Sequence, residues 1–374
     1  MAEQYTHALQ EKEFVSILSR YLLRQNLYLM SICLCLGIAI YLLSDLFERL
    51  DDFLEAGRGL KIMLVYFLVK IPLIISQILP AVFLVAMLVQ LSAMRSNREL
   101  LALRAGGVSF RAIITFFLIY SLIWSAGQLF ISQYLGVRGL EYSKRIWAEE
   151  VRGKEYSTKA IRQLWLREEN NIIFIDTVQP STGKGQDLSI YTLAQDRRSV
   201  VQFIKAQAFE ASEGQWELKN VTLIDPVRFT SEYKPTLNIS LGEAFKSFTL
   251  AESRNNPAQL PLWELGRAIH QLEVTGSNVE GLRTIWHGKL SYAFSITIMA
   301  FLALAIITFE HNVYLNLTAG LVATFLFYGL FVLGSSAGEM GFLPPVAGAW
   351  LGNTLFVLGA VARLFWRSIA RSAS

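Results

Sequence analysis

The stretch IMLVYFLVKIPLIISQILPAVFLVAMLVQL, residues 62–91, has a single charged residue, Lys70, among thirty positions. At a rise of about 1.5 Å per residue, a helix of this length measures about 45 Å, whereas the hydrocarbon core of a bilayer is about 30 Å thick. The stretch is too short for two spans and a loop, so it predicts one long, tilted membrane helix. Its prolines, Pro72 and Pro80, are expected to be kinks, which membrane helices tolerate.

Other apolar runs of similar length follow the same pattern. They lie at about 27–46, 112–135, 286–308, 315–334 and 344–366. The chain is 53% hydrophobic and 17% charged, whereas soluble domains are about 25% charged. The sequence therefore predicts an α-helical membrane protein with six transmembrane helices.

Between the third and fourth runs, from 136 to 283, the sequence changes character. Short segments rich in β-branched and aromatic residues alternate with turn signals such as STGKGQD (181–187). This pattern is typical of a β-sandwich or jelly-roll domain of about 100 residues. The flanking segments LEYSKRIWAEEV (140–151) and LPLWELGRAIHQLEV (260–274) are predicted to be helices that join this domain to the membrane spans.

Positive charge predicts the topology, because cytoplasmic loops carry an excess of lysine and arginine. With a cytoplasmic amino terminus, the cytoplasmic segments contain Lys12, Arg20, Arg24, Arg95, Arg98, Arg104, Arg111, Arg363, Arg367 and Arg371. The opposite short loops, 45–61 and 334–344, are acidic or nearly uncharged. We therefore expect both termini inside, helices 1–3 in residues 1–135, an external jelly-roll-like β-domain with helical connectors in 136–283, and helices 4–6 in 284–374.

The segment RSNRELLALRAGG, residues 95–107, is predicted to be a cytoplasmic helix of about three turns. Ser96 and Glu99 have the spacing of a capping box, and Gly106 or Gly107 can end the helix in the left-handed conformation. Its apolar stripe would be Leu100, Leu101 and Leu103, and its free polar residues Arg98, Glu99 and Arg104. Two interpretations remain open: a solvated helix in which Glu99 only caps, and a rigid contact through which an ATPase subunit pushes on both flanking spans.

Motifs of several function classes are absent from the sequence. It has no G-x-x-x-x-G-K-[ST] phosphate loop, so any ATP must be hydrolysed by another subunit. It has no HExxH or GxSxG motif, and its four histidines are too scattered to suggest a metal cluster. A net charge of +4 without a long basic block gives nucleic-acid binding little support. We therefore predict a chain that is not an enzyme and has no cofactor or metal of its own.

Lys70 is the clearest ionisable residue inside a span, about 12 Å from the outer end of its helix. Its ammonium group could snorkel to the membrane surface as an anchor, or it could contact an anionic lipid headgroup. Cationic residues near the outer ends of the first, second and fourth spans could join it: Arg49, Arg58, Lys61 and Lys289.

Several segments, in the same order, resemble one family over nearly the whole chain. They are RSNRELLALRAGGVSF (95–110), QLWLREENNIIFIDTV (163–178), LSIYTLAQDRR (188–198), GQWELKNVTL (214–223), LPLWELGRAIHQLEVTG (260–276) and EMGFLPPVAGAWLGN (339–353). The sequence is similar to the LptF/LptG family of lipopolysaccharide-export ABC transporter permeases, and more similar to LptG than to LptF. The resemblance implies six spans and a periplasmic β-jelly-roll.

The resemblance also implies partners and a function. The family works as a heterodimer of two related permeases, so the expected paralogue is LptF. The pair sits on a dimeric LptB ATPase, which binds ATP and Mg, and LptC supplies a further jelly-roll. The dimer takes lipopolysaccharide from the outer leaflet of the bacterial inner membrane, and ATP-driven closure passes it to the periplasmic bridge.

Roles for particular residues follow from the same resemblance. The segment after span two is similar to the family's coupling helix, so Glu99 is expected to contact the ATPase, with Arg98, Leu103 and Arg104 around it. Where LptG proteins can carry lysines that meet lipopolysaccharide phosphates, this chain has the mainly acidic DLFERLDDFLEAGRG (45–59). Headgroup contacts are then expected from the cations already named, with Lys70 first among them, or from bridging divalent ions.

The β-domain would offer apolar strand faces to acyl chains. The expected lining residues are Phe174, Ile190, Phe203 and Phe209, and the alternative for each is ordinary core packing. Two rival functions remain open. One is a permease-like protein that relays the state of an ATPase without moving lipid, which would need no apolar cavity open to the bilayer. The other is an intramembrane hydrolase, which would need a nucleophile and a base facing one cavity.

Overall fold

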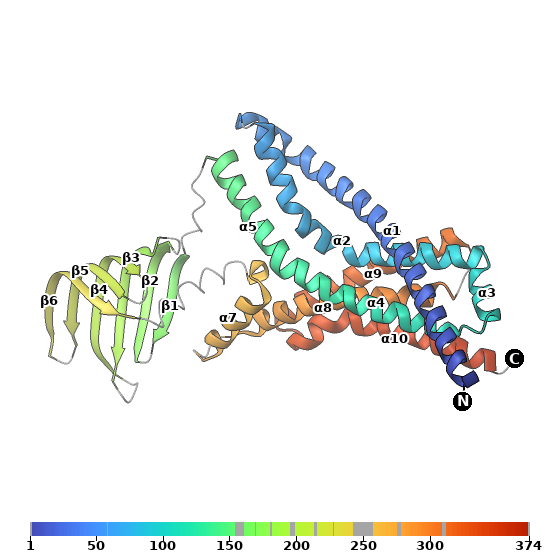
Figure 1. Ribbon diagram of the computed structural model, residues 1–374. Helices are drawn as coiled ribbons and strands as arrows, with labels where there is room; N and C mark the ends of the chain where they lie inside the picture. The colour runs from blue at the N-terminus through green and yellow to red at the C-terminus, as the bar shows by residue number, and fades with distance from the viewer. Residues whose placement is uncertain are drawn as a thin grey trace. The chain divides into compact units, whose positions relative to one another are not determined.

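The computed structural model describes residues 2–57, 59–153, 161–168, 170–179, 182–194, 199–212, 215–226, 228–241, 257–274, 278–308 and 312–372. The chain forms two compact units (Figure 1). The helical unit comprises Met1–Trp147 and Glu280–Ser374, and the β-unit comprises Ala148–Val279.

Among the described residues, six helices are long and apolar enough to span a membrane, which confirms the six predicted spans. They are α1 (Ala2–Glu55), α2 (Leu60–Ser96), α4 (Phe110–Phe130) with its continuation, α8 (Glu280–Ile306), α9 (Val313–Glu339) and α10 (Pro345–Ser372). The continuation of α4 runs through η1 (Ile131–Gly136), α5 (Val137–Ile146) and η2 (Trp147–Val151). The helices extend beyond the predicted runs because backbone hydrogen bonding continues past the point where side chains become polar.

The core of the helical unit surrounds the second half of α2. Leu79, Phe83, Leu88 and Met94 of this helix are fully buried, and α2 packs against α1, α8 and α9. The stretch 62–91 is one helix, as predicted, with Pro72 and Pro80 inside it.

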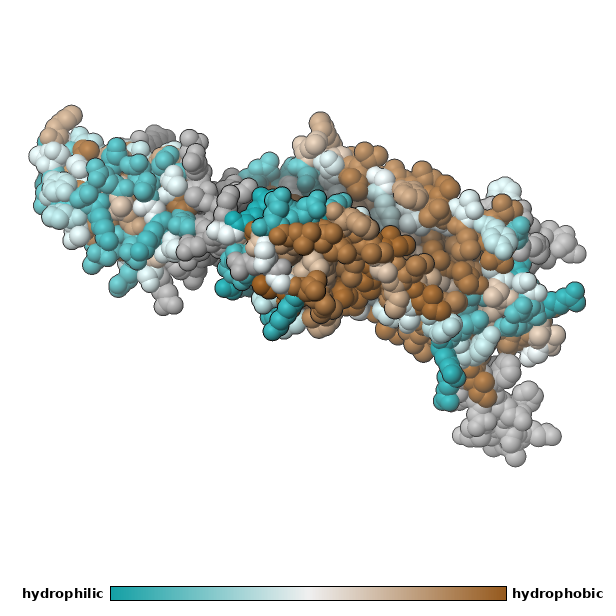
Figure 2. Space-filling view, turned by 90° about the horizontal axis from the view of Figure 1, so that it is seen from above, coloured by the Kyte–Doolittle hydropathy of each residue, from teal (hydrophilic) through white to brown (hydrophobic). Residues whose placement is uncertain are grey.

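By contrast, α1 packs chiefly against α2, and only 6% of its most apolar stretch is buried. Figure 2 shows hydrophobic side chains gathered over the helical unit, whereas hydrophilic ones dominate the visible face of the β-unit. The exposed apolar side chains of α1 include Tyr28, Leu36, Ile40, Phe47 and Leu54. The helical unit therefore presents a surface suited to lipid or to another membrane protein.

The β-unit contains the predicted all-β domain. In its described part, the six strands are β1 (Ile161–Glu168), β2 (Asn171–Gln179), β3 (Lys184–Leu193), β4 (Val200–Ser212), β5 (Gln215–Asp225) and β6 (Thr230–Ser240). They form one antiparallel sheet in sequence order, so each strand pairs with its neighbours in the chain. The predicted helical flanks correspond to α5 with η2 before the sheet and α7 (Leu262–Val274) after it.

A crease crosses the sheet along one row of residues. Asp187 of β3 and Asn220 of β5 have positive φ angles of 51° and 53°, and Gln207 lies between them in the register. The amide of Asn220 donates to Gln207 Oε1 at 3.1 Å. In a regular strand, residues that face the same side of the sheet are two positions apart. On either side of this row, the nearest buried residues of a strand are three positions apart: Ile175 and Val178, Ala206 and Phe209, and Leu218 and Val221. The strands therefore change direction together while the same face of the sheet remains buried.

Candidate functional site

The short helix α3 (Glu99–Ala105) lies between α2 and α4 and has no buried residue. Leu100 and Leu103 pack partly against the helical core. Leu101 is 65% exposed, and Arg98 and Arg104 are also exposed. The predicted stripe of three leucines is therefore split, and the outward face of α3 presents one apolar side chain flanked by two cations.

The predicted capping box at Ser96 is wrong. Ser96 is the last residue of α2, whose hydrogen-bond ladder continues to the Asn97 N–H group. Arg98 then takes the left-handed conformation, with φ 60°, and α3 begins only at Glu99. The helix has seven residues, about two turns rather than three. Gly107, with φ +85°, provides the expected left-handed residue after it.

Glu99 uses its carboxylate to join α3 to α1. The Tyr21 hydroxyl donates to Glu99 Oε2 at 2.9 Å, and the Asn97 amide donates to Oε1 at 3.4 Å. The carboxylate is half-buried and is held at the edge of the outward face of α3. A basic partner group that reached this face would therefore meet an oriented acceptor.

A second group of polar side chains lies between α1 and α2, and we refer to it as the Asp45 cluster: Asp45, Arg49, Tyr66, Lys70 and Trp147. Lys70 Nζ lies 2.5 Å from Asp45 Oδ2, and both side chains are about nine-tenths buried. Arg49 Nε donates to Asp45 Oδ1 at 2.9 Å. Lys70 Nζ also donates to the Tyr66 hydroxyl at 3.2 Å. One carboxylate therefore binds two cations, and the cluster keeps a net charge of +1.

Aromatic side chains enclose the Asp45 cluster. The Arg49 guanidinium lies over the Trp147 ring, 4.3 Å from its centroid, and Phe53 makes edge-on contacts with Tyr66 and Trp147 at 5.4 and 5.6 Å. The Asp45 and Lys70 side chains are largely shielded from solvent, which strengthens their charge interaction, whereas Arg49 is about a third exposed. The cluster thereby fastens α1, α2 and the start of η2 to one another.

The structure brings together two of the predicted headgroup residues, Arg49 and Lys70. The Lys70 ammonium does not snorkel outward in this arrangement, because it is bound to Asp45. Lys61 is exposed in the first turn of α2, and Lys289 is half-buried on α8. The remaining candidate, Arg58, lies outside the described residues. Sequence reasoning missed Asp45 as the partner, because the residue lies 25 positions before Lys70 and only the helix packing brings them together.

The four predicted acyl-chain residues divide between the two faces of the sheet. Ile190 and Phe209 belong to the buried core, where the Phe209 and Trp216 rings stack at 5.1 Å. Phe174 and Phe203 lie half-buried on the opposite face. The two groups therefore cannot line a single channel in this sheet.

Two aromatic residues that the sequence analysis did not single out complete the row on the opposite face. Trp165, which is 56% exposed, lies 4.7 Å from Phe174, and Tyr191 lies 4.8 Å from Phe203, both between ring centroids. Trp165 and Tyr191 stack at 6.5 Å. Each of the strands β1 to β4 contributes one aromatic residue to this row, and only the strand register brings the four together.

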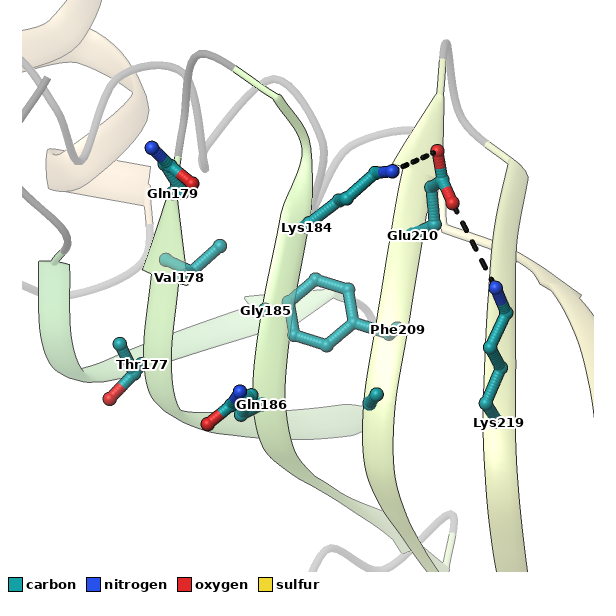
Figure 3. Close-up of a pocket in the computed structure, with 10 residues that line it drawn as sticks. Thr177, Val178, Gln179, Lys184, Gly185, Gln186, Phe209, Glu210 and Lys219 are labelled. Atoms are coloured by element: carbon teal, nitrogen blue, oxygen red, sulfur yellow. Dashed lines mark ion pairs between the residues drawn. The ribbon is translucent and has the colours of Figure 1, made fainter. Parts of the chain in front are cut away.

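A hollow of about 400 Å³, lined by both apolar and polar residues, lies over β2 to β5, on the far side of the crease from the aromatic row. Figure 3 shows Glu210 between Lys184 and Lys219, with nitrogen–oxygen distances of 3.4 and 4.0 Å. Thr177, Gln179 and Gln186 add hydroxyl and amide groups to its lining. Val178, Ala208 and the Phe209 ring supply the apolar part of the same lining.

Within the described ranges, no three His, Cys, Asp or Glu side chains come close enough to hold a metal ion. Residues 20–367 match the family model described as lipopolysaccharide export system permease LptF/LptG. The chain belongs to the LptF/LptG family. The match runs from α1 to α10 and includes α3, the Asp45 cluster and the whole sheet.

As an LptF/LptG permease, the chain is a multi-pass inner-membrane component of the lipopolysaccharide export system. It is a transport component rather than an enzyme, and it acts with partner proteins of that system. The family model covers LptF and LptG together. Comparison with individual curated proteins gives no match.

Proposed function

We propose that this permease is the LptG-type half of the transporter. It pairs with LptF on a dimeric LptB ATPase, which binds ATP and Mg, and it delivers lipopolysaccharide towards LptC. In this role it takes the lipid from the outer leaflet of the inner membrane and passes it to a periplasmic β-jelly-roll bridge. Both termini and α3 are cytoplasmic, and the β-unit is periplasmic.

The exposed face of α3 is the observation that supports the ATPase contact in this proposal. Leu101, Arg98 and Arg104 face outward on a helix that follows α2 after a two-residue turn, while Tyr21 orients the Glu99 carboxylate. An apolar side chain flanked by charges is typical of a protein docking surface. Because α3 is short and lies between two membrane helices, a push on it passes into α2 and α4.

The charge distribution supports the proposed orientation. Arg95, Arg98, Arg104 and Arg111 lie around α3, whereas Asp45, Glu48, Asp51, Asp52 and Glu55 lie in the last third of α1. Cytoplasmic ends of membrane helices are enriched in arginine and lysine. The α3 end of the helical unit is therefore the cytoplasmic end.

The interior face of the sheet supports a role in handling lipid. It is a continuous apolar cluster that includes Ile173, Leu188, Ile190, Phe209 and Leu218. Acyl chains that leave the bilayer would otherwise meet water, at a cost of about 0.8 kcal/mol for each exposed CH2 group. An apolar face that opens during transport would remove most of this cost.

In-cell photocrosslinking tests the ATPase contact. A photoreactive residue at Leu101 should yield an adduct with the ATPase subunit, identified by mass. The same probe at Leu103 is the matched control, because this side chain packs against the helical core and should give a much weaker adduct. Equal labelling from both positions, or an adduct without the ATPase, would contradict docking on the outward face of α3.

A second probe separates a lipid transporter from a relay that moves no lipid. A photoreactive residue at Phe209 should capture lipopolysaccharide in an ATP-dependent manner, whereas one at Trp165, on the other face of the sheet, should capture much less. If neither position captures lipid while the Leu101 probe captures the ATPase, the relay is the better description.

A further inference from the structure

The carboxyl-terminal end of α8 is held by arginines from two other helices. The last carbonyl groups of a helix have no partner within it and carry partial negative charge, so cations stabilise this end. The Arg95 guanidinium of α2 donates to the carbonyl of Ile307, the first residue after α8. Arg363 of α10 donates to the Thr308 hydroxyl at 3.3 Å, and this hydroxyl donates to the Ala305 carbonyl at 2.7 Å. Helices α2 and α10 therefore both fix the end of α8.

Arg95 also forms the turn that leads into α3. Its carbonyl group accepts a hydrogen bond from the Arg98 N–H group at 3.1 Å, where the chain leaves α2 and enters α3. Its side chain, in the last turn of α2, reaches a carbonyl group 212 positions later in the chain. One residue therefore joins the start of α3 to the end of α8.

A second polar contact from the same end of α2 reaches α9. The Asn316 amide, in the first turn of α9, donates to the Ser92 hydroxyl at 3.3 Å, and both side chains are buried. Ser92 lies three positions before Arg95, so the two residues project from the same side of α2. Separating such buried polar groups leaves them without partners, which resists sliding between the helices. One side of α2 thus contacts both the end of α8 and the start of α9.

We propose that Arg95 is a positioning residue through which movement of α3 reaches α8 and α9. When the ATPase displaces α3, the end of α2 moves with it. The Arg95–Ile307 and Ser92–Asn316 contacts then carry the end of α8 and the start of α9 in the same direction. This inference rests on the proposed function, which places the ATPase on α3, and it extends the path of the push beyond the flanking helices α2 and α4.

A positioning role differs from a purely stabilising cap in what it controls. A cap that only stabilises α8 affects folding and the amount of assembled transporter. A residue that transmits movement also affects how much lipid moves for each ATP hydrolysed. Lipid transfer per ATP, measured in normally assembled transporter, therefore separates the two roles.

The test uses the complete transporter in proteoliposomes that contain lipopolysaccharide. The readout is the lipid captured by a photoreactive residue at Phe209 for each ATP hydrolysed, and the Leu101 probe reports ATPase docking in parallel. Arg95→Met removes the charge and the donor groups, whereas Arg95→Lys keeps a cation. Arg111→Met is the matched control, because Arg111 is an exposed arginine in the first turn of α4, close in sequence to α3.

We expect Arg95→Met to lower lipid capture per ATP about fivefold, an effect typical of losing one coupling contact. The ATPase adduct at Leu101 should remain at its unmodified level. Arg95→Lys should recover about half of the loss, because a cation stays at the helix end, and Arg111→Met should match the unmodified chain. Unchanged capture in Arg95→Met, or an equal loss in Arg111→Met, would overturn the proposal. A parallel loss of the ATPase adduct would also overturn it, because Arg95 would then act in docking.

A distance measurement with Arg95 intact keeps the proposal testable if Arg95→Met does not assemble. Cys33 and Cys35 are replaced by alanine, and spin labels are placed at the exposed positions Ala105 of α3 and Tyr314 of α9. Their separation should stay constant when ATP is trapped, while labels on the two ATPase subunits show that closure has occurred. A changed Ala105–Tyr314 distance would refute the transmission.

Failure of the proposed function gives a different result. In that case the Leu101 probe captures no ATPase in the unmodified chain, whatever residue occupies position 95. If the unmodified chain captures the ATPase and Arg95→Met still transfers lipid normally, only the role of Arg95 is wrong.

Discussion

Gln128 of α4 donates its side-chain amide to the carbonyl oxygen of Ser76 in α2. Ser76 lies four residues before Pro80, and proline has no N–H group to complete that helical hydrogen bond. In the next position, the Tyr292 hydroxyl of α8 donates to the Gln77 carbonyl at 2.5 Å. Neighbouring helices thus donate to the carbonyl groups that precede Pro80 by about one turn, as a membrane interior requires.

We predict that Gln128→Leu destabilises the helical unit by about 1 kcal/mol, because the Ser76 carbonyl loses its donor in a buried place. Pro80→Ala restores a backbone N–H group to the same carbonyl. The effect of Gln128→Leu should therefore be smaller in the Pro80→Ala background, and thermal unfolding of all four forms in detergent measures this coupling. If the effects of Gln128→Leu and Pro80→Ala on stability are strictly additive, Gln128 does not act by bonding the carbonyl that Pro80 leaves without a donor.

Helices α9 and α10 should depend on glycine at one crossing. A Cβ atom at Gly348 would lie 2.7 Å from the Gly334 carbonyl oxygen and 2.9 Å from Gly338 Cα, and small residues spaced by four are typical of close membrane-helix packing. Gly348→Ile should therefore prevent stable folding of the helical unit. Gly359→Ile, in the same helix with open space around it, should be tolerated, and the yield of monodisperse protein distinguishes the two.

If the ATPase docks on α3 as proposed, Glu99→Ala should weaken ATPase binding about tenfold, because a charge-assisted contact would be lost. Tyr21→Phe removes only the hydroxyl that donates to Glu99, so the carboxylate remains and binding should change less than about threefold. Co-purification of the ATPase with each variant, at matched membrane levels, measures the effect. If Tyr21→Phe weakens binding as much as Glu99→Ala, the main role of Glu99 is to hold α1.

The two faces of the sheet should respond differently to truncation. Phe209 is 2% exposed and stacks on Trp216, so Phe209→Ala should destabilise the β-unit by about 3 kcal/mol through the cavity it leaves. Trp165→Ala should cost about 1 kcal/mol, mainly its ring contact with Phe174. Urea-dependent proteolysis of the full chain between residues 148 and 279 measures both. A larger effect for Trp165 would mean that the aromatic row, and not the core face, stabilises the sheet.

Hydropathy was sufficient to predict the six spans, because a bilayer demands about twenty apolar residues from any helix that crosses it. The length of 62–91 also predicted a single helix, since thirty residues cannot form two spans. The β-unit was predictable from the same kind of argument: short apolar segments and turn residues recur there at a spacing that suits strands.

Features that depend on tertiary contacts were not predictable. Ser96 and Glu99 have the spacing of a capping box, but α2 continues through Ser96 and Glu99 binds Tyr21 instead. The pairing of Asp45 with Lys70 depends on how α1 lies against α2. Likewise, Ile190 and Phe203 are both apolar strand residues, and only their positions in the strand register show that they face opposite ways.

The few polar contacts of α1 have a thermodynamic consequence. A displacement of α1 within the bilayer would exchange protein for hydrocarbon around its apolar side chains, so little apolar surface would meet water and the heat-capacity change would be small. The polar contacts at Tyr21, Leu22, Gln25, Asn26 and Asp45 would then contribute much of the enthalpy that sets its position. The balance between its positions should therefore follow a nearly linear van't Hoff plot, without the curvature that accompanies protein unfolding in water.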